Sequence, residues 1–498
     1  MIILGGGISG LSAAWFAAKR QPGIPIMVLE AASRPGGWIQ TSVDDNQVLN
    51  EYGPRTLRPN GCMGTATLEL VHSLGLEHQV LSVAKGTAAA KNRFVLFDNE
   101  IQKMPTSLSE ALFPPKRHLF RGVAARASLE PLVARSTDLD ESIHAFVERR
   151  FGSRVADNLI SALVHGIFAG DSRVLSVRAC FPFLWDAEQK YGSVILGLLA
   201  DAIKGSPPEV FSPNTSPEAI AFVQRIKSCS VYAFKDGLQT LTDAIATDLL
   251  QNHHNVTILK NTRATKLELI NSGTAVKVST DSGKTFESSR VISSLSLPTL
   301  KSLLPDTSAL SPLLCANPTV DVAVVNLSYS NPNILPVTGF GYLVPRTQKS
   351  NVIGVIFDSC AIPGQGPSNT PAVTRITCMM GGHRFKQLFG TGPFDESACL
   401  KMAQDAIKQD LGISEPPLSS HVTLNRECIT QYTVGHIQRL QEMHRVLQSE
   451  YSGRLSVIGA SYLGVGVNHC VYYAREAISR IMDGSPMVTG LESCIEQK

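Results

Sequence analysis

The sequence Ile2-Ile3-Leu4-Gly5-Gly6-Gly7-Ile8-Ser9-Gly10-Leu11 lies at the start of the chain and decides its fold. A helix-forming run from Ser12 to Lys19 follows, and then the apolar segment Ile26-Met27-Val28-Leu29, which ends at Glu30. A strand, a Gly-x-Gly-x-x-Gly turn, a helix and a second strand that ends in an acid about twenty residues later make up a dinucleotide-binding βαβ unit. We therefore predict a nucleotide site in preference to a glycine-rich structural turn.

The three glycines of this motif have different mechanical roles. Gly5 allows the tight turn out of the first strand, Gly7 lets the backbone approach a pyrophosphate, and Gly10 lets the helix pack against the strand. The N-terminus of the helix offers free N–H groups and a partial positive charge to phosphates. Glu30 is placed to accept hydrogen bonds from a ribose. Cofactor contacts are expected from Gly5, Gly6, Gly7, Ile8, Ser9, Gly10, Glu30 and Ala31.

The loop that follows Glu30 narrows the choice of cofactor. It carries Arg34 and the run Gly36-Gly37-Trp38, and it resembles the extended flavin fingerprint of the amine oxidase and phytoene desaturase superfamily. In that superfamily, the arginine and the glycines lie along the FAD diphosphate and ribityl chain. The resemblance implies that Arg34, Gly37 and Trp38 contact FAD, whereas NAD-binding units do not typically carry this loop.

Length and composition set further bounds. A chain of 498 residues is too long for one core and should form two or three domains. The net charge of only +3 gives no sign of a nucleic-acid-binding face. Cysteines and histidines show no zinc-type spacing, so no metal site is expected.

No apolar run reaches the ~18 residues of a spanning helix. Because the chain starts at its first strand, any organelle address is expected to be internal.

Two later turns are expected to reach the flavin. Gly53-Pro54-Arg55-Thr56 looks like the loop under the isoalloxazine ring, although Arg55 could instead form an ion pair within the turn. The second turn, Ala460 to Asn468, follows an apolar strand and is rich in small residues, with contacts expected from Ala460, Val465, Gly466 and Val467. The helix after it would direct N–H groups at the flavin. The backbone around Ala264 is expected at the adenine end of FAD.

The middle of the chain is predicted to be helical from Pro105 to about Gly205, and to alternate strands and turns from Asp321 to Ile376. Within the helical part, Pro114 to Arg126 is cationic, and Leu119, Phe120, Val123 and Ala127 recur at helical spacing. This pattern is typical of an interfacial helix on a membrane surface. An ordinary surface helix is the alternative interpretation.

A closer resemblance extends over nearly the whole chain. Asn92-Arg93-Phe94, the run from Gly339 to Pro345 and the run from Gln431 to His436, together with both glycine motifs, resemble in order the oxygen-dependent protoporphyrinogen oxidases of the animal mitochondrial type. His469 departs from the pattern, because an acid is familiar at that position.

The resemblance implies an activity and a site. The family uses FAD, bound non-covalently and one per chain, and O2 to convert protoporphyrinogen IX to protoporphyrin IX with release of hydrogen peroxide. Arg93 would pair with a substrate propionate, and Phe340, Gly341, Leu343 and Met379 would line the pocket. Ordinary core packing is the alternative for the apolar members. No side chain is assigned as a catalytic acid or base, because the flavin carries the chemistry.

The resemblance also implies partners and a location. The family is dimeric and bound to the surface of the mitochondrial inner membrane on its intermembrane-space side, and its product could pass to ferrochelatase. A flavin amine oxidase, a carotenoid desaturase and a non-catalytic FAD-binding scaffold are alternatives that share both glycine motifs.

The predicted fold class is α/β with α+β insertions. It comprises a discontinuous FAD-binding Rossmann-like domain, an antiparallel-sheet substrate domain and a helical, membrane-associated domain. The expected boundaries are residues 1–84, 227–305 and 429–498 for the FAD-binding segments, 85–226 for the mostly helical domain and 306–428 for the substrate domain.

Overall fold

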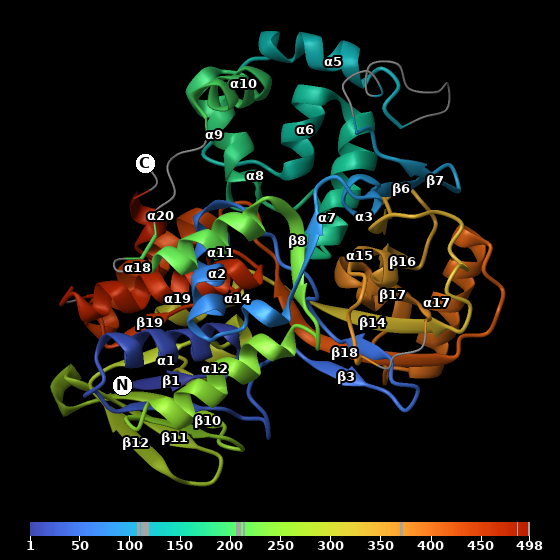
Figure 1. The fold of residues 1–498 in the computed structure, drawn as a ribbon. Coiled ribbons are helices and arrows are strands. Elements are labelled where there is room, and N and C mark those ends of the chain that lie inside the picture. Colours follow the sequence, from blue (N-terminus) through green and yellow to red (C-terminus); the bar gives the residue numbers. More distant parts are fainter. Residues whose placement is uncertain are drawn as a thin grey trace.

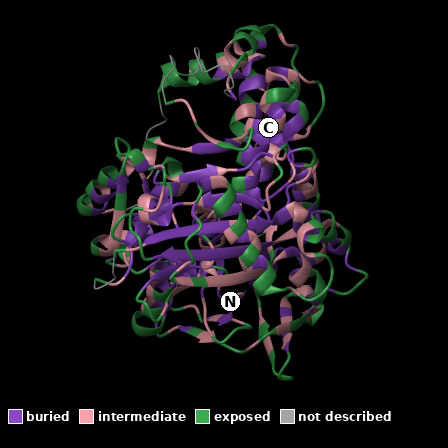
Figure 2. Cartoon of the chain, turned by 90° about the vertical axis from the view of Figure 1, so that its right-hand side faces the viewer, coloured by how far each residue is buried: buried purple, intermediate pink, exposed green. Residues whose placement is uncertain are grey.

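A computed structural model describes residues 1–498 except 107–109, 111–118, 206–210, 213–214, 369–371, 486 and 497–498. Figure 1 shows three regions: a parallel sheet between layers of helices and strands, a second large sheet beside it, and a helical region above both. Figure 2 shows that the strands of the sheets form the most buried layer.

The parallel sheet contains five strands in the order β19-β13-β1-β2-β9, and every neighbouring pair is parallel. The strands are β1 (Ile2–Leu4), β2 (Ile26–Leu29), β9 (Val256–Leu259), β13 (Val291–Ser293) and β19 (Leu455–Val457). They come from three separate parts of the sequence. Every residue of β1, β13 and β19 is buried, as expected of a sheet covered on both sides. The predicted α/β class is confirmed.

Two apolar clusters cover the faces of this sheet. One cluster contains Leu11, Leu68, Ile245 and Val471. It is formed by α1 (Ile8–Arg20), α2 (Gly61–Ser73), α11 (Pro217–Lys227), α12 (Gln239–Asn252) and α19 (Val467–Met482). The other face packs against β10 (Ala264–Ile270), β11 (Ala275–Thr280), β12 (Thr285–Ser288), α13 (Leu297–Leu303), α14 (Leu310–Cys315) and α18 (His436–Tyr451).

The second large sheet has seven strands in the order β18-β14-β17-β16-β15-β6-β7. They are β6 (Phe94–Phe97), β7 (Glu100–Lys103), β14 (Thr319–Tyr329), β15 (Gly341–Leu343), β16 (Val352–Ile356), β17 (Thr374–Gly381) and β18 (Ser419–Thr430). Neighbours are antiparallel except β15 and β6, which are parallel. α17 (Glu396–Leu411) packs on one face, and the antiparallel prediction for this part of the chain is confirmed.

One predicted boundary needs correction. The division at residue 85 assigns β6 and β7 to the helical domain, whereas both strands extend the seven-stranded sheet. The physical reason is the pairing of β6 with β15, which lies far away in the sequence. Local sequence patterns carry no information about such a partner.

The helical region has its own apolar core, which includes Phe146, Phe168, Phe181 and Trp185. Its helices are α5 (Val123–Leu129), α6 (Ile143–Phe151), a π-helical turn (Val155–Ile160), α7 (Ser161–Phe168), α8 (Val177–Cys180), α9 (Pro182–Tyr191) and α10 (Val194–Lys204). Helical structure is therefore confirmed for this part of the chain. Within the described ranges, no helix is both long and apolar enough to cross a membrane.

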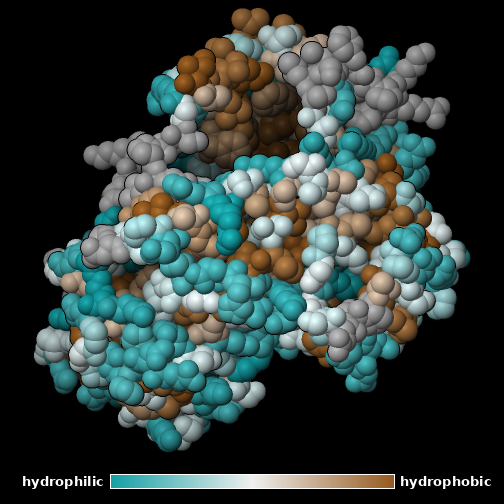
Figure 3. Space-filling model, in the orientation of Figure 1, coloured by the Kyte–Doolittle hydropathy of each residue, from teal (hydrophilic) through white to brown (hydrophobic). Residues whose placement is uncertain are grey.

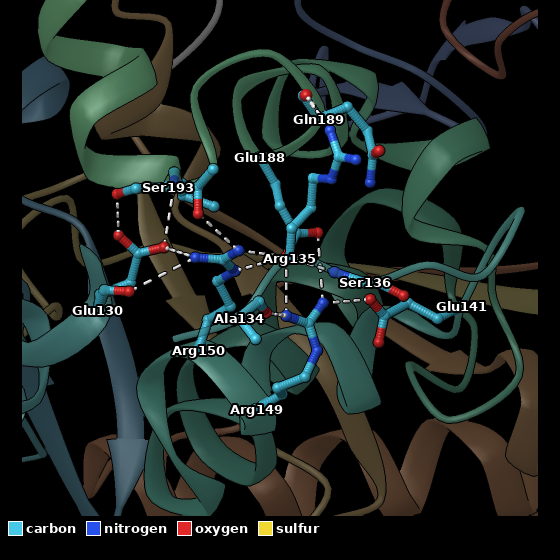
Figure 4. A network of polar contacts seen from close by, with 12 residues as sticks. Glu130, Ala134, Arg135, Ser136, Glu141, Arg149, Arg150, Glu188, Gln189 and Ser193 are labelled. Carbon is cyan, nitrogen blue, oxygen red and sulfur yellow. Dashed lines mark hydrogen bonds and ion pairs between the residues drawn. The ribbon is translucent and has the colours of Figure 1, made fainter. Parts of the chain in front are cut away.

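A buried network of charges ties these helices together (Figure 4). Arg150 of α6 forms ion pairs with Glu130 and Glu188, and all three side chains are fully buried. Glu130 also accepts hydrogen bonds from the N–H groups of Val194 and Ile195 at the start of α10. One carboxylate thus caps a helix and neutralises a buried arginine.

The interfacial helix predicted around residue 119 is wrong in its first half. Leu119 and Phe120 lie in a turn, and α5 begins only at Val123. Leu119 is buried against Val95 and Ala162, so it faces the protein. Residues 114–118 of that prediction lie outside the described residues.

Candidate flavin and substrate site

The first glycine turn has the geometry that its sequence predicts. Gly5 has φ of 93°, in the left-handed region that favours glycine. A Cβ on Gly10 would lie 1.9 Å from the carbonyl oxygen of Gly5, so only glycine allows α1 to come this close to β1. Glu30 accepts hydrogen bonds from the N–H groups of Gly6 and Ala32, both at 2.7 Å. These bonds hold the acid at the tip of β2.

The N-terminus of α1 has no side-chain cap, and Gly7 is the residue before it. The first N–H groups of this helix therefore point at the surface of the turn without a side-chain acceptor, which suits a phosphate. The segment before Ala264 reaches the same end of the sheet, because Thr262 and Asn261 donate to the carbonyl groups of Glu30 and Ala32 at 2.8 and 3.0 Å.

The second loop packs directly on the first. The N–H of Gly36 donates to the carbonyl of Gly6 at 2.8 Å, and a Cβ on Gly37 would lie 3.2 Å from the Cα of Gly7. The guanidinium of Arg34 donates to the carbonyl oxygens of Pro35, Ile39 and Gly37. Arg34 therefore holds the loop in shape, and its predicted contact with the flavin stays a prediction.

The C-terminal turn repeats this design at a second helix. α19 also begins after a glycine, Gly466, without a side-chain cap. Tyr432 holds the turn: its hydroxyl donates to the carbonyl of Ala460 at 2.6 Å and accepts from the N–H of Gly464 at 2.9 Å. Burial keeps the pKa of Tyr432 well above its ordinary value, so the phenol stays protonated. Val465 and Val467 follow in the same turn and the first turn of the helix.

Tyr432 was not assigned a role from the sequence, although it lies in a motif that the resemblance used. Its ring stacks on His436 with centroids 4.1 Å apart. His436 accepts from the amide of Asn317 at Nδ1, so its Nε2 donates to the carbonyl of Tyr462 at 2.7 Å. Burial lowers the pKa of His436 to about 4. A neutral, fully bonded histidine thus supports the tyrosine.

His469 lies where the resemblance leads one to expect an acid. A Cβ on Gly464 would lie 2.2 Å from its Cδ2 atom, so the imidazole packs on the glycine-rich turn. Nδ1 is buried and has no hydrogen-bond partner among the described residues. Burial lowers the pKa of His469, which favours the neutral ring. The first turn of α19 therefore receives no negative charge from this position.

Arg55 forms a buried ion pair with a distant acid, and not the ion pair within its own turn that was the alternative to a flavin contact. Its guanidinium is buried, lies 2.8 Å from a carboxylate oxygen of Asp358 and also donates to the hydroxyl of Thr377. Gly53 is required for another reason, because a Cβ there would lie 2.3 Å from the carbonyl oxygen of Trp38. Burial raises the pKa of Glu51, close to this ion pair, to about 7. Contacts of Pro54, Arg55 and Thr56 with a flavin stay predictions.

The predicted pocket residues lie on the seven-stranded sheet. Registered pairs place Leu343, Gly354 and Met379 side by side across β15, β16 and β17. The side chain of Leu343 packs against Gly354, the residue without a side chain in this row. Leu343 lies between Gly354 and Gly166 of α7, since a Cβ on either glycine would contact its Cδ2 atom, at 3.2 and 2.5 Å.

The solvent exposure of these residues argues against simple core packing. Phe340, Leu343 and Met379 are all partly exposed, whereas Tyr342 and Met380, their neighbours in the chain, are buried. Gly341 has φ of 143°, and a Cβ there would lie 2.1 Å from the carbonyl of Val355. Glycine is therefore needed to keep β15 paired with β16.

Arg93 lies over the ring of Phe340, with the guanidinium carbon 4.8 Å from the ring centroid. The two segments are locked together, because the N–H of Phe340 donates to the carbonyl of Asn92 at 3.0 Å and the amide of Asn92 donates to the carbonyl of Thr338 at 2.8 Å. Two residues that the sequence separates by more than two hundred positions thus form one stacked pair.

The site combines two uncapped helix N-termini that begin at glycines, an acid at the end of β2 and backbone lined by glycines. Together these features define a protein that binds a dinucleotide of the flavin type. The described residues contain no cluster of three or more side chains that could hold a metal ion.

Comparisons with known proteins agree with this class. Residues 8–482 match the model of the flavin containing amine oxidoreductases. The chain is 36% identical to human protoporphyrinogen oxidase over 98% of this chain and 99% of that protein. It is 28% identical to the coproporphyrinogen III oxidase of Bacillus subtilis, with 96% and 97% of the two chains covered. A solved structure of a candidate protoporphyrinogen oxidase from Exiguobacterium sp. 255-15 superposes with a TM-score of 0.77 at 21% identity, over 97% of this chain and 98% of that one. The chain belongs to the flavin containing amine oxidoreductases and, within them, to the protoporphyrinogen oxidase family.

Proposed function

We propose that this protein oxidises protoporphyrinogen IX to protoporphyrin IX, with one non-covalently bound FAD per chain and O2 as the final acceptor. Six hydrogens leave the porphyrinogen, and three molecules of O2 become three of hydrogen peroxide. The family and the stacked pair of Arg93 and Phe340 beside the row of Leu343, Gly354 and Met379 support this proposal. A positively charged side chain at the edge of this apolar row suits a flat macrocycle that carries carboxylates.

The residues present fit FAD. The uncapped start of α1 would receive the diphosphate, Glu30 the ribose, and the turn before α19 the flavin ring. When bound, the flavin supplies a hydride acceptor. The protein's own residues bind and orient the substrate and exclude water, and no side chain is assigned as acid or base.

Arg93→Ala is expected to raise the KM for protoporphyrinogen about 10- to 100-fold, because a charge-assisted hydrogen bond to a carboxylate is lost. Flavin content should stay unchanged, since Arg93 directly precedes β6 of the seven-stranded sheet and lies outside both glycine turns. Arg225→Ala is a matched control, because Arg225 also stacks on a phenylalanine, Phe222 of α11. An unaltered KM in the Arg93 variant would contradict the assignment.

Anaerobic titration with protoporphyrinogen tests the function itself. We expect bleaching of the flavin on addition of substrate, and porphyrin fluorescence after air is admitted. Reduction by benzylamine but not by the porphyrinogen would favour an amine oxidase, and reduction by a carotenoid precursor, which is a linear polyene, would indicate a desaturase. Absence of bleaching with every substrate would indicate a flavin-binding scaffold. Coproporphyrinogen III is titrated in the same way, as a second porphyrinogen substrate.

We further propose that the helical region rests on a membrane surface. On α10, only Val194 and Gly197 are buried, while Leu196, Leu198, Leu199 and Ile203 are exposed. Leu132 and Ile203 have 82% and 86% of their surfaces exposed. Figure 3 shows this hydrophobic surface at the top of the molecule, around a hollow lined by hydrophobic residues. Such a surface is typical of a membrane or partner contact.

Family resemblance supports the mitochondrial inner membrane, its intermembrane-space side, a homodimer and hand-over of product to ferrochelatase.

Replacing both Leu199 and Ile203 with glutamate is expected to lower binding to anionic phospholipid vesicles at least about tenfold, because the apolar area that would enter the bilayer is lost. The fold should tolerate exposed charges. Vesicle flotation measures the binding. Leu250→Glu on α12 is the control, since Leu250 is comparably exposed far from the helical region. Equal binding by both variants would contradict the membrane surface.

A further inference from the structure

Arg93 and the nearby Arg58 have no carboxylate partner in the part of the chain that the structure describes. No ion pair links Arg93 or Arg58 to any acid among the described residues, whereas Arg55 in the same loop as Arg58 has Asp358. Arg93 is half-buried and contacts a ring, and Arg58 is exposed. Cations that stay unpaired beside an apolar pocket are candidates for binding an anion.

The backbone next to Arg58 lies close to the residues beside Arg93. Leu57, the residue before it, exchanges backbone hydrogen bonds with Tyr232 at 2.8 and 2.9 Å. The flanking residues Val231 and Ala233 of β8 (Cys229–Phe234) pack in one cluster with Phe340, over which Arg93 lies. The two arginines therefore flank a common apolar cluster.

One further contact places Arg58 beside the turn proposed for the flavin, and an electrostatic interaction shows that Arg58 is close to Arg93. The carbonyl of Arg58 accepts a hydrogen bond at 2.7 Å from the amide of Asn468, in the first turn of α19. Burial lowers the pKa of Arg93, and the positive charge of Arg58 lowers it further. The charges thus repel each other in the ligand-free protein, and an anion between or beside them would relieve the repulsion.

We propose that Arg58 binds the second carboxylate of the substrate, so that Arg93 and Arg58 together select a macrocycle with two propionates on one edge. This inference rests on the proposed function. Protoporphyrinogen IX carries its two propionates on neighbouring pyrroles, and two guanidinium groups on one side of an apolar floor match that arrangement. Arg58 would act at the exposed rim, where it orients the ring without contacting the reacting carbon.

The test is a binding titration of the FAD-loaded protein, in which porphyrin fluorescence reports how much ligand is bound. The ligands are protoporphyrin IX and its dimethyl ester, which differ in charge and little in shape. Wild type should bind the diacid more tightly than the diester. Arg58→Gln should lose about tenfold in affinity for the diacid and nothing for the diester, because only the ionic contact is removed. Arg58→Lys should restore part of the loss.

Arg225→Gln provides the control for a general change in charge, and thermal melting checks that each variant is folded. Equal losses for diacid and diester, or no loss for either, would overturn the role of Arg58 and leave the proposed function intact. If the wild type binds neither porphyrin, the result contradicts both the proposed function and this inference. A diacid preference that falls with ionic strength in wild type, and less so in Arg58→Gln, would support the ionic contact.

Discussion

Gly10→Ala is expected to leave the purified protein with at most about a tenth of its normal flavin content. The new Cβ would lie 1.9 Å from the carbonyl oxygen of Gly5 and 2.9 Å from the hydroxyl of Ser294. Neither can yield easily, because Ser294 donates to the carbonyls of Leu4 and Gly5 and so holds the end of β1. α1 would have to move away from the sheet, which would displace the N–H groups that we propose receive the diphosphate. Such overpacking costs about 1–3 kcal/mol.

Flavin absorbance per mole of protein after gel filtration measures this effect, and thermal melting measures the cost to the fold. Gly86→Ala is the matched control, because a Cβ at Gly86 would meet no atom within 4 Å and the residue does not have a positive φ. Gly23→Ala is a second control of the same kind. A Gly10 variant that retains a full complement of flavin would contradict the geometry proposed for the diphosphate.

Arg150→Met is expected to destabilise the protein by about 3–5 kcal/mol, since it leaves two buried carboxylates without their shared cation. The side chains of Arg150, Glu130 and Glu188 are all fully buried. Arg150 is also bonded through its Nε to Glu188 at 2.8 Å. Urea denaturation followed by tryptophan fluorescence suits the measurement, because Trp185 lies in the core of the same region.

Arg445→Met is the control for removal of an arginine, because Arg445 is exposed and pairs with exposed Glu442 on α18. Such a surface pair contributes about 0.2–1 kcal/mol. A loss in the Arg150 variant no larger than that in the Arg445 variant would show that the buried network adds little.

The pH dependence of the same variant provides an independent check. Burial raises the pKa values of Glu130 and Glu188, but their hydrogen bonds and arginine partners outweigh burial and lower both below the ordinary value. Their stabilisation is thus complete above the unfolded pKa of about 4.3 and is lost as pH falls through the lowered pKa values. In Arg150→Met, the carboxylates lose a shared cation and take up protons more easily. The stability deficit should therefore shrink between about pH 7 and pH 4, and a constant deficit would contradict this account.

The sequence predicted best where chemistry and backbone geometry are local. The first glycine turn, the apolar strands on either side of it and the small-residue turn before α19 all depend on residues close together in the chain. Gly5 needs a positive φ and Gly10 needs close packing, so glycine spacing alone indicates them. The strands from Val322 onward were equally readable, because short apolar runs separated by turns rich in Pro, Gly and Asn are also a local signal.

The errors and omissions arise from contacts between distant segments. Asp358 and Thr377, the partners of Arg55, lie some three hundred positions beyond it. Leu119 shares helical spacing with Val123, yet burial against Val95 and Ala162 decided its conformation. Tyr432 had no visible role until its hydroxyl was seen between Ala460 and Gly464.

The sequence by itself determined that the chain carries a βαβ nucleotide unit and a second glycine-rich helix start, because both depend on short stretches with strict steric demands. Only the tertiary structure decided that β13 lies between β19 and β1 in the parallel sheet, that β6 joins the seven-stranded sheet, and that Arg93 stacks on Phe340. Strand pairing and side-chain burial are set by the free energy of the whole packed chain. No single stretch of sequence determines that free energy. The residues to which we assign substrate binding therefore come together only in the packed fold.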